Sequence, residues 1–316
     1  MATAVTAAAG VREHARRPAL GYAMVIAAAT LFGINGAVSK VALSSGMSAL
    51  RLTEARSAGA FVGLTALALA TRPASLRLRP GEWWRLAIFG VAGVAWVQLF
   101  YFLAIDRLPI GIALLIQYLG PLLVALWVVG VRHEPVRRRV WVALAFSLVG
   151  LALMVQLWRG VTLDGLGVVF ALIAAVVFAA YLLLAEREVA GRDAISLLAW
   201  GFLFATVFWT LVQPWWSFPA GAVGSTVPLE GRLAGLHLPV WALVLWVVVL
   251  GAIVPFVLIV GALRHVPATR VGIVAMLEPV VATVVAWIWL RQSLSAAQLA
   301  GAAVVLVGVA LAQTAR

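Results

Sequence analysis

Apolar stretches of about 20 residues follow one another along the chain, separated by short segments rich in Arg, Pro and Gly. An α-helix needs about that length to cross a hydrocarbon core about 30 Å thick. The pattern predicts ten membrane-spanning helices, at 19–42, 49–70, 85–105, 109–130, 139–157, 164–185, 195–213, 240–262, 268–290 and 295–313. The segment 49–70 has the weakest apolar signal, because three charged residues lie near its beginning.

The fourth and fifth predicted spans recur in the ninth and tenth. Aligned without gaps at an offset of 158 residues, the two segments share three landmarks: Pro109 with Pro267, Pro121 with Pro279, and Gly150 with Gly308. The first spans of the two halves correspond more faintly, with 27–33 resembling 173–179 at an offset of 146. The chain is therefore an internal duplication: a tail at 1–18, one five-helix repeat at 19–158 and a second at 159–316. Because five is odd, the second repeat is expected to be inverted relative to the first.

Arginine is distributed unevenly between the two sides of this predicted topology, with 16 residues on one side and 4 on the other. Basic residues are enriched in cytoplasmic loops, so both termini are predicted to be cytoplasmic. The difference between the two offsets places an insertion in the second half, within the Pro- and Gly-rich segment 214–239, on the outer side.

Composition limits the function classes. The chain is 65% hydrophobic and 11% charged, with a mean hydropathy of +1.09, so almost nothing remains for a soluble catalytic domain. The net charge of +12 comes from arginines in short loops, which argues against a nucleic-acid groove. There is no Cys, no GxxxxGK[ST] loop and no HExxH motif, so we expect no disulfide, no metal, no cofactor, no direct use of ATP and no enzyme activity.

The residues resemble a known family. The segments FYFLAIDRLPIGIALLIQYLGPLLVAL (100–126) and LRHVPATRVGIVAMLEPVVATVVAWIWLRQSLSAAQLAGAAVVLVGVAL (263–311) are similar to the EamA-type branch of the drug/metabolite transporter superfamily. The resemblance implies an all-α integral membrane fold of ten helices in two inverted repeats. It also implies a bacterial inner-membrane exporter with a central cavity lined by spans 3, 4, 8 and 9. One departure is that Gln292 stands where family members often carry Glu, whereas the first copy has Glu134.

Two prolines lie in the middle of spans, where proline removes a backbone hydrogen bond and kinks a helix. Pro121 and Pro279 would free the carbonyls of Gln117 and Ala275, and a freed carbonyl in lipid must face protein or water. The two kinks are therefore either cavity-lining elements or packing kinks. Pro255 in the eighth span predicts a third kink, without a proline counterpart in the first half.

Glu278 is the acidic residue deepest in a span. It lies ten residues in from Ala268, which at about 1.5 Å per residue is about 15 Å, near the centre of the bilayer. An unpaired carboxylate there costs about 2.5 kcal/mol or more, so it should be protonated or paired. Two roles remain open: a site for a proton or an amine, or a structural brace beside the kink.

Other polar residues could line a cavity or form a gate. Lys40 and Arg56 are candidates for a pairing with Glu54 that changes as the cavity opens, the alternative being ordinary snorkelling to the interface. The polar groups within apolar runs are either interhelical hydrogen bonds or ligand contacts: Asn35, Gln98, Tyr101, Gln117, Tyr118 and Tyr181. Trp96 is either an aromatic wall of the cavity or a residue that faces lipid.

Taken together, these features predict a secondary transporter, a monomer or homodimer in the lipid bilayer, that exports a small-molecule substrate by alternating access. The substrate is expected to be an amino acid or derivative, moved by a proton gradient or by its own gradient. The alternative within transport is a multidrug or organic-cation exporter. The alternative outside transport is a membrane scaffold or receptor, which a mid-span Glu278 and the paired kinks disfavour.

Overall fold

A computed structural model of the chain describes residues 17–108, 110–158, 164–291 and 293–314. Six spans are single helices: α1 (Pro18–Leu43), α2 (Ala49–Thr71), α7 (Arg138–Val155), α8 (Gly165–Val189), α9 (Ala194–Val212) and α15 (Ala296–Thr314). The described residues thus contain ten spans, as the apolar pattern predicts. Most of the predicted N-terminal tail, Pro109 and Gln292 lie outside them.

The four remaining spans are interrupted, and they hold the same places in the two halves. The third span is α3 (Trp83–Ile88), the π-helix η2 (Phe89–Ala95) and α4 (Trp96–Ile105), and the eighth is α11 (Val240–Val248), the π-helix η5 (Val249–Ile253) and α12 (Val254–Ala262). The fourth is α5 (Ile110–Gln117) and α6 (Gly120–Gly130), and the ninth is α13 (Ala268–Ala275) and α14 (Leu277–Ile288). The interruptions therefore follow the duplication.

Helix α2 is the tenth span, although it is less apolar than the other nine. Its charged residues Arg51, Glu54 and Arg56 are confined to the first two turns, and 57–71 is apolar or small. The helix packs against α9 and α11, so it belongs to the bundle. The weak hydropathy signal thus reflects three residues and not a missing span.

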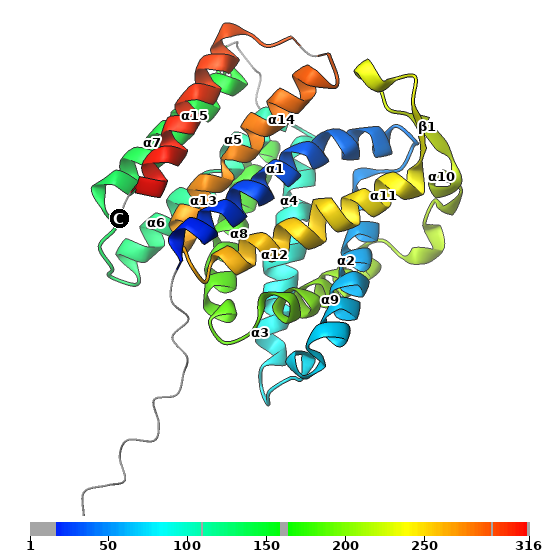
Figure 1. Cartoon of the computed structure of the whole chain (residues 1–316), viewed down its shortest axis with the longest axis horizontal. Coiled ribbons are helices and arrows are strands. Elements are labelled where there is room, and N and C mark those ends of the chain that lie inside the picture. The colour runs from blue at the N-terminus through cyan, green and yellow to red at the C-terminus, as the bar shows by residue number, and fades with distance from the viewer. Residues whose placement is uncertain (1–16, 109, 159–163, 292, 315–316) are drawn as a thin grey trace, which may run out of the picture.

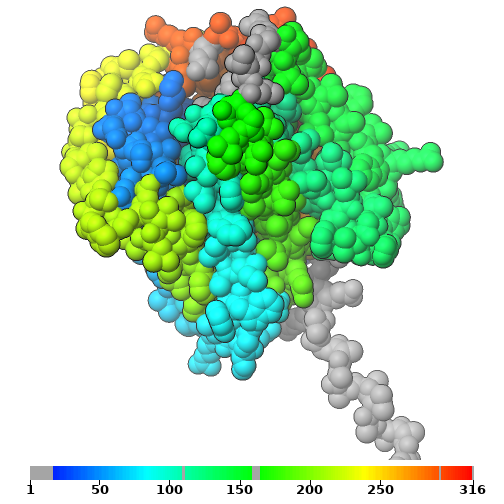
Figure 2. Space-filling view, turned by 180° about the vertical axis from the view of Figure 1, so that it is seen from behind, coloured from blue at the N-terminus to red at the C-terminus, as the bar shows by residue number. Residues whose placement is uncertain are grey.

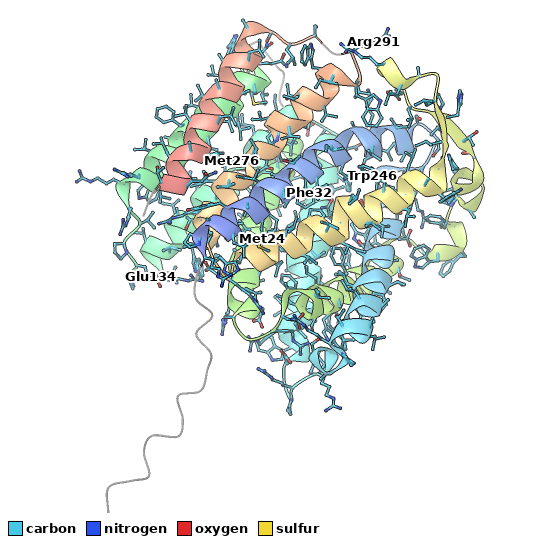
Figure 3. The ribbon with its side chains drawn as sticks, viewed as in Figure 1. Met24, Phe32, Glu134, Trp246, Met276 and Arg291 are labelled. Atoms are coloured by element: carbon cyan, nitrogen blue, oxygen red, sulfur yellow. The ribbon has the colours of Figure 1, made fainter. Side chains whose placement is uncertain are left out.

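The two repeats are inverted in space. His133 and Arg291, which are 158 residues apart, both end a span in the left-handed conformation, with φ of 54° and 57°. Figure 3 shows Glu134 and Arg291 at opposite ends of the molecule. The same local structure therefore occurs on opposite sides of the membrane, as an inverted repeat requires.

Helices from the two halves pack against each other in corresponding pairs, α2 with α9, α6 with α13 and α7 with α15. Figure 1 shows α7 and α15 side by side. A Cβ at Gly150 would lie 2.7 Å from the Gly301 carbonyl oxygen, so this pair needs glycine at its crossing. Seen from behind, α3 and α4 lie beside α8, between α2 and the α6–α7 region (Figure 2).

The chain loops gather at two ends. We call the end that carries the loops 44–48 and 213–239 the hairpin end, and the other the basic end. The hairpin end contains η3 (Trp215–Ser217), α10 (Ala220–Gly224), η4 (Gly231–Leu233) and the antiparallel strands β1 (Thr226–Pro228) and β2 (His237–Pro239), and the 3-10 helix η1 (Pro73–Leu76) lies at the basic end. The ordered hairpin within 214–239 is a feature that the sequence analysis did not predict.

Ion pairs cross-link the basic end. Arg85 pairs with Glu188 at 2.6 Å, and Arg132 pairs with Glu186 at 2.8 Å. Three further contacts tie this end together: Arg192 with Glu82 at 2.7 Å, the Glu186 carboxylate with the Ala268 backbone N–H, and the Tyr22 hydroxyl with the Ala312 carbonyl. The first and last described helices therefore meet at this end.

The apolar core has a different shape at each end. One large cluster of buried side chains from both halves fills the middle and the basic end, and it reaches the hairpin end at Trp209 of α9 and Met154 of α7. At the hairpin end two smaller clusters are separate from it and from each other. One joins α1, α2, β1 and α11, and the other joins α4, α5 and α8.

Candidate functional site

The site is built on the two helix breaks. Helix α5 ends at Gln117 and α6 begins at Gly120, while α13 ends at Ala275 and α14 begins at Leu277. Each break comes just before the proline of its half, which cannot donate the hydrogen bond that would continue the helix. The breaks touch, because a Cβ at Gly272 of α13 would lie 2.7 Å from the Pro121 ring.

Tyr118, in the first break, reaches the second break. Its hydroxyl lies 2.9 Å from Glu278 Oε2 and 3.3 Å from the Ala275 carbonyl oxygen. The Ala275 carbonyl is the one that Pro279 leaves without its helical partner, so the tyrosine supplies the missing donor. A hydroxyl has one proton for these two acceptors. A neutral Glu278 carboxyl could donate to Tyr118 while Tyr118 donates to Ala275.

Arg56 and Tyr101 complete the polar part of the site. Both lie near Glu278, and both are half-buried. Arg56 forms no ion pair within the described residues, and its buried Nε has no hydrogen-bond partner there. The site therefore holds one cation and one carboxyl that do not pair with each other within the described residues.

The two π-helices make corresponding contacts. Gly93 of η2 packs against Tyr181, and a Cβ there would lie 3.4 Å from the ring. Gly251 of η5 packs against the Asn35 amide, which a Cβ would overlap. Gly93 and Gly251 are 158 residues apart, and Asn35 and Tyr181 are 146 apart, so the contacts are equivalent in the two halves. The Tyr181 hydroxyl and Asn35 Oδ1 are buried without a partner among the described residues.

Aromatic rings form a floor between the charged site and the basic end. Tyr181 stacks on Phe89 and Phe178, with ring centroids 5.8 and 6.5 Å apart, and meets Phe256 edge-on at 5.9 Å. Tyr118 meets Phe178 at 6.1 Å. These rings come from four spans, so the floor joins both halves.

The other predicted cavity residues divide into two groups. Gln117 is half-buried in the first break, and its Oε1 has no partner within the described part of the chain. Gln98 is half-buried on α4. Trp96 is 39% exposed and packs edge-on against Phe100 on the same helix, at 6.1 Å, which favours its lipid-facing alternative.

Neither of the predicted gate pairings is formed in this structure, and whether the pairing changes as the cavity opens stays a prediction. Glu54 pairs with Arg51, at 2.7 Å, and not with Lys40 or Arg56. Arg51 also hydrogen-bonds the carbonyls of Gln213 and Pro214 and the hydroxyl of Ser217. Lys40 instead lies 3.6 Å from Glu230 in the hairpin segment, as an exposed pair. The sequence could not show the partners Glu230, Pro214 and Ser217, because they come from the inserted segment.

Pro255 also differs from its prediction. It lies at the start of α12, directly after η5, so its missing N–H coincides with the widened π-helical turn and not with a simple kink. Its counterpart in the first half is the π-helix η2, which has no proline at that point. The sequence signal that could have found both was the pair Gly93 and Gly251 at the offset of 158.

Among the residues that the structure describes, no group of His, Cys, Asp and Glu could hold a metal ion. The site itself offers hydrogen bonds and opposite charges beside aromatic rings, a combination that is typical of small-molecule sites.

Comparison with known proteins identifies the fold. Residues 19–156 and 165–314 each match the EamA-like transporter family. The chain belongs to this family. This EamA-like transporter is 31% identical over 247 residues to the threonine/homoserine exporter RhtA of Escherichia coli (strain K12), covering 75% of this chain and 76% of that protein. It is 26% identical over 241 residues to Protein PecM of Dickeya dadantii (strain 3937), covering 75% of this chain and 76% of that one.

A solved crystal structure has the same fold, with a TM-score of 0.73 over 92% of this EamA-like transporter and 96% of that chain, at 19% identity. Family membership confirms the predicted family and the ten-helix fold of two inverted repeats. The protein is a multi-pass membrane transporter.

Proposed function

We propose that this EamA-like transporter exports small amino acids or closely related metabolites from the cytoplasm across the inner membrane by alternating access. The observation that carries the proposal is a carboxyl, Glu278, held by Tyr118 between two helix breaks at the centre of the bundle. The name of the relative RhtA, a threonine/homoserine exporter, supports the amino-acid class.

We further propose that the structure corresponds to an outward-open state. The aromatic floor and the ion pairs close the basic end, whereas the apolar core at the hairpin end is divided among the large cluster and two small separate ones. The arginine asymmetry supports a cytoplasmic basic end and a cytoplasmic tail at 1–18. Closing the hairpin end and opening the floor would require the repeats 19–158 and 159–316 to exchange conformations.

Within this proposal Glu278 receives the substrate's amine, a proton, or each in turn. If the amine and the proton compete for Glu278, export of the substrate is coupled to entry of protons. If they do not compete, the gradient of the substrate alone drives transport. A purely structural brace is the contrasting role. Glu278 as a residue is only half-buried, which supports a functional site, because a brace has no need of an accessible surface.

An organic-cation exporter is the second candidate. It is favoured by the carboxyl of Glu278 beside the rings of Tyr118 and Phe178, because such a group attracts a cation that aromatic faces also bind. The cation Arg56 in the same site, which forms no ion pair within the described residues, opposes it.

Exchange of radiolabelled amino acids in proteoliposomes tests the function. Wild-type protein should exchange L-threonine or L-homoserine. Glu278→Gln should exchange them at least about tenfold more slowly, which corresponds to a barrier higher by about 1.4 kcal/mol. Asp106→Asn, which removes an exposed carboxylate from the end of α4, is the matched control and should exchange at the wild-type rate. Exchange of quaternary amines and no amino acid would replace the proposal with the second candidate.

A further inference from the structure

Arg56 is an unusual arginine for this protein. It is seven residues into α2 from Ala49, which at about 1.5 Å per residue is about 10 Å from the hairpin end. Its Nε is buried and has no hydrogen-bond partner among the described residues. A charged group inside the membrane is costly unless it is paired, and such groups mark substrate pathways.

The other arginines of the bundle interior and its rim are engaged. Arg51, Arg85, Arg132 and Arg192 each bind a carboxylate at 2.6–2.8 Å. Arg56 is a neighbour of Glu278 in the interior but forms no ion pair with it within the described structure. Glu278 instead bonds to Tyr118. Arg56 and Glu278 are thus two opposite charges in the interior that do not pair with each other in the described structure.

We infer that Arg56 and Glu278 form a two-point receptor for a zwitterion. Arg56 binds the α-carboxylate of an amino acid and Glu278 binds its α-ammonium group. The inference rests on the proposed function and deepens it by assigning substrate recognition to these two residues.

The geometry orients the substrate. Glu278 is ten residues from Ile288, or about 15 Å from the hairpin end, and Arg56 is about 10 Å from it. The carboxylate of a bound amino acid therefore lies nearer the hairpin end and its amine lies deeper, above the aromatic floor. The planar guanidinium fork suits a carboxylate, which it binds with two parallel hydrogen bonds. Gln117 precedes Tyr118 in the first break and keeps a buried Oε1 without a partner in the described structure, so we assign it to the substrate side chain.

A zwitterion satisfies both charges, whereas a cation leaves Arg56 unpaired and an anion leaves Glu278 unpaired. An unpaired polar or charged group in a closed site carries the cost of its own desolvation. The site should therefore reject both an amino-acid amide and an N-acetyl amino acid, each of which keeps the shape of the substrate and lacks one charge.

Thermal-shift binding to purified full-length protein tests the receptor. The 20 common amino acids and L-homoserine are screened first, and the best binder is then compared with its amide and its N-acetyl derivative. Wild-type protein should bind the amino acid at least about tenfold more tightly than either derivative, which corresponds to about 1.4 kcal/mol per lost charge. Arg56→Gln should lose the preference for the amino acid over its amide and keep the preference over the N-acetyl derivative. Glu278→Gln should lose the preference over the N-acetyl derivative and keep the preference over the amide.

The crossed pattern distinguishes recognition from misfolding, since a protein that merely failed to fold would lose both preferences together. Arg56→Lys keeps the charge and should retain part of the preference. Arg107→Gln removes an exposed arginine near the hairpin end and should keep both preferences.

Two results would overturn the inference. Equal binding of the amino acid and its amide by wild-type protein would show that Arg56 does not bind the α-carboxylate, and the proposed export of amino acids would remain valid. Binding of organic cations with no binding of any amino acid would overturn both the receptor and the proposed function.

Discussion

Buried polar side chains in this transporter differ in whether the protein itself satisfies them. Arg192 is fully satisfied, because it binds Glu82 and the Ser196 hydroxyl together with the carbonyls of Ser75 and Arg77. Arg56, Asn35, Gln117 and Tyr181 each keep a buried polar atom without a partner in the described structure. Satisfied groups hold the bundle together, whereas groups without partners are the ones a substrate or water would bind.

The ion pair of Glu82 with Arg192, at the basic end, should make the stability of the protein depend on pH. Hydrogen bonds from Arg192 lower the pKa of Glu82 below its ordinary value. A depressed carboxyl pKa adds stability that is present above the unfolded-state pKa, about 4.3, and is lost as pH falls through the folded-state pKa. Glu82→Gln should lower the free energy of unfolding by about 1.5–3 kcal/mol at pH 7, and the difference from wild type should shrink below about pH 4.3.

Thermal unfolding in detergent across pH 3–8 is the measurement. Glu134→Gln, which alters an exposed carboxylate at the same end, is the control and should change little. A difference between wild type and Glu82→Gln that stayed constant down to pH 3 would show that the charge of Glu82 does not stabilise the basic end.

The interrupted spans are the elements that give the site its shape. The breaks at Pro121 and Pro279 followed from the sequence, because proline has one local effect on a helix wherever it occurs. The π-helices did not, because a widened turn depends on what packs against it: Tyr181 against Gly93, and the Asn35 amide against Gly251. Whether the two prolines govern transport stays a prediction.

Gly251 should be required for its π-helix contact. Gly251→Ala places a methyl group where the Asn35 amide lies, and overpacking of this kind costs about 1–3 kcal/mol. We expect a lower melting temperature together with slower transport, because Asn35 must move. Gly36→Ala is the matched control on α1, where nothing lies within 4 Å of the added methyl, and it should be neutral or slightly stabilising. Equal behaviour of the two variants would mean that the contact is not important.

At the scale of the whole molecule, the ten spans and the inverted duplication could be predicted from the sequence, because hydropathy and internal repeats depend only on the order of the residues. The partners of Arg51 and Lys40 were not, because both contact the inserted segment around Glu230 and Ser217. Electrostatic neighbours such as Arg56 and Glu278 also come from different halves, so only the folded bundle brings them together.

The orientation is a prediction that the absence of Cys makes easy to test. Ser225, exposed in the hairpin segment, is expected on the outer face, and Ala74, exposed at the basic end, in the cytoplasm. In intact cells an impermeant maleimide should label Ser225→Cys and should label Ala74→Cys only after permeabilisation. The reverse pattern would invert the assigned direction of transport.

The central claim is that an amino acid binds between the helix breaks in a cavity open to the hairpin end. The most direct measurement is the alkylation rate of Gln117→Cys by an impermeant reagent added outside, with and without the amino acid that binds best. We predict reaction of the free protein and at least about tenfold protection by the saturating ligand, while Ala185→Cys, fully buried on the far side of the floor, stays unreactive. A Gln117→Cys protein that did not react from outside, or that reacted equally fast with bound amino acid, would contradict the account.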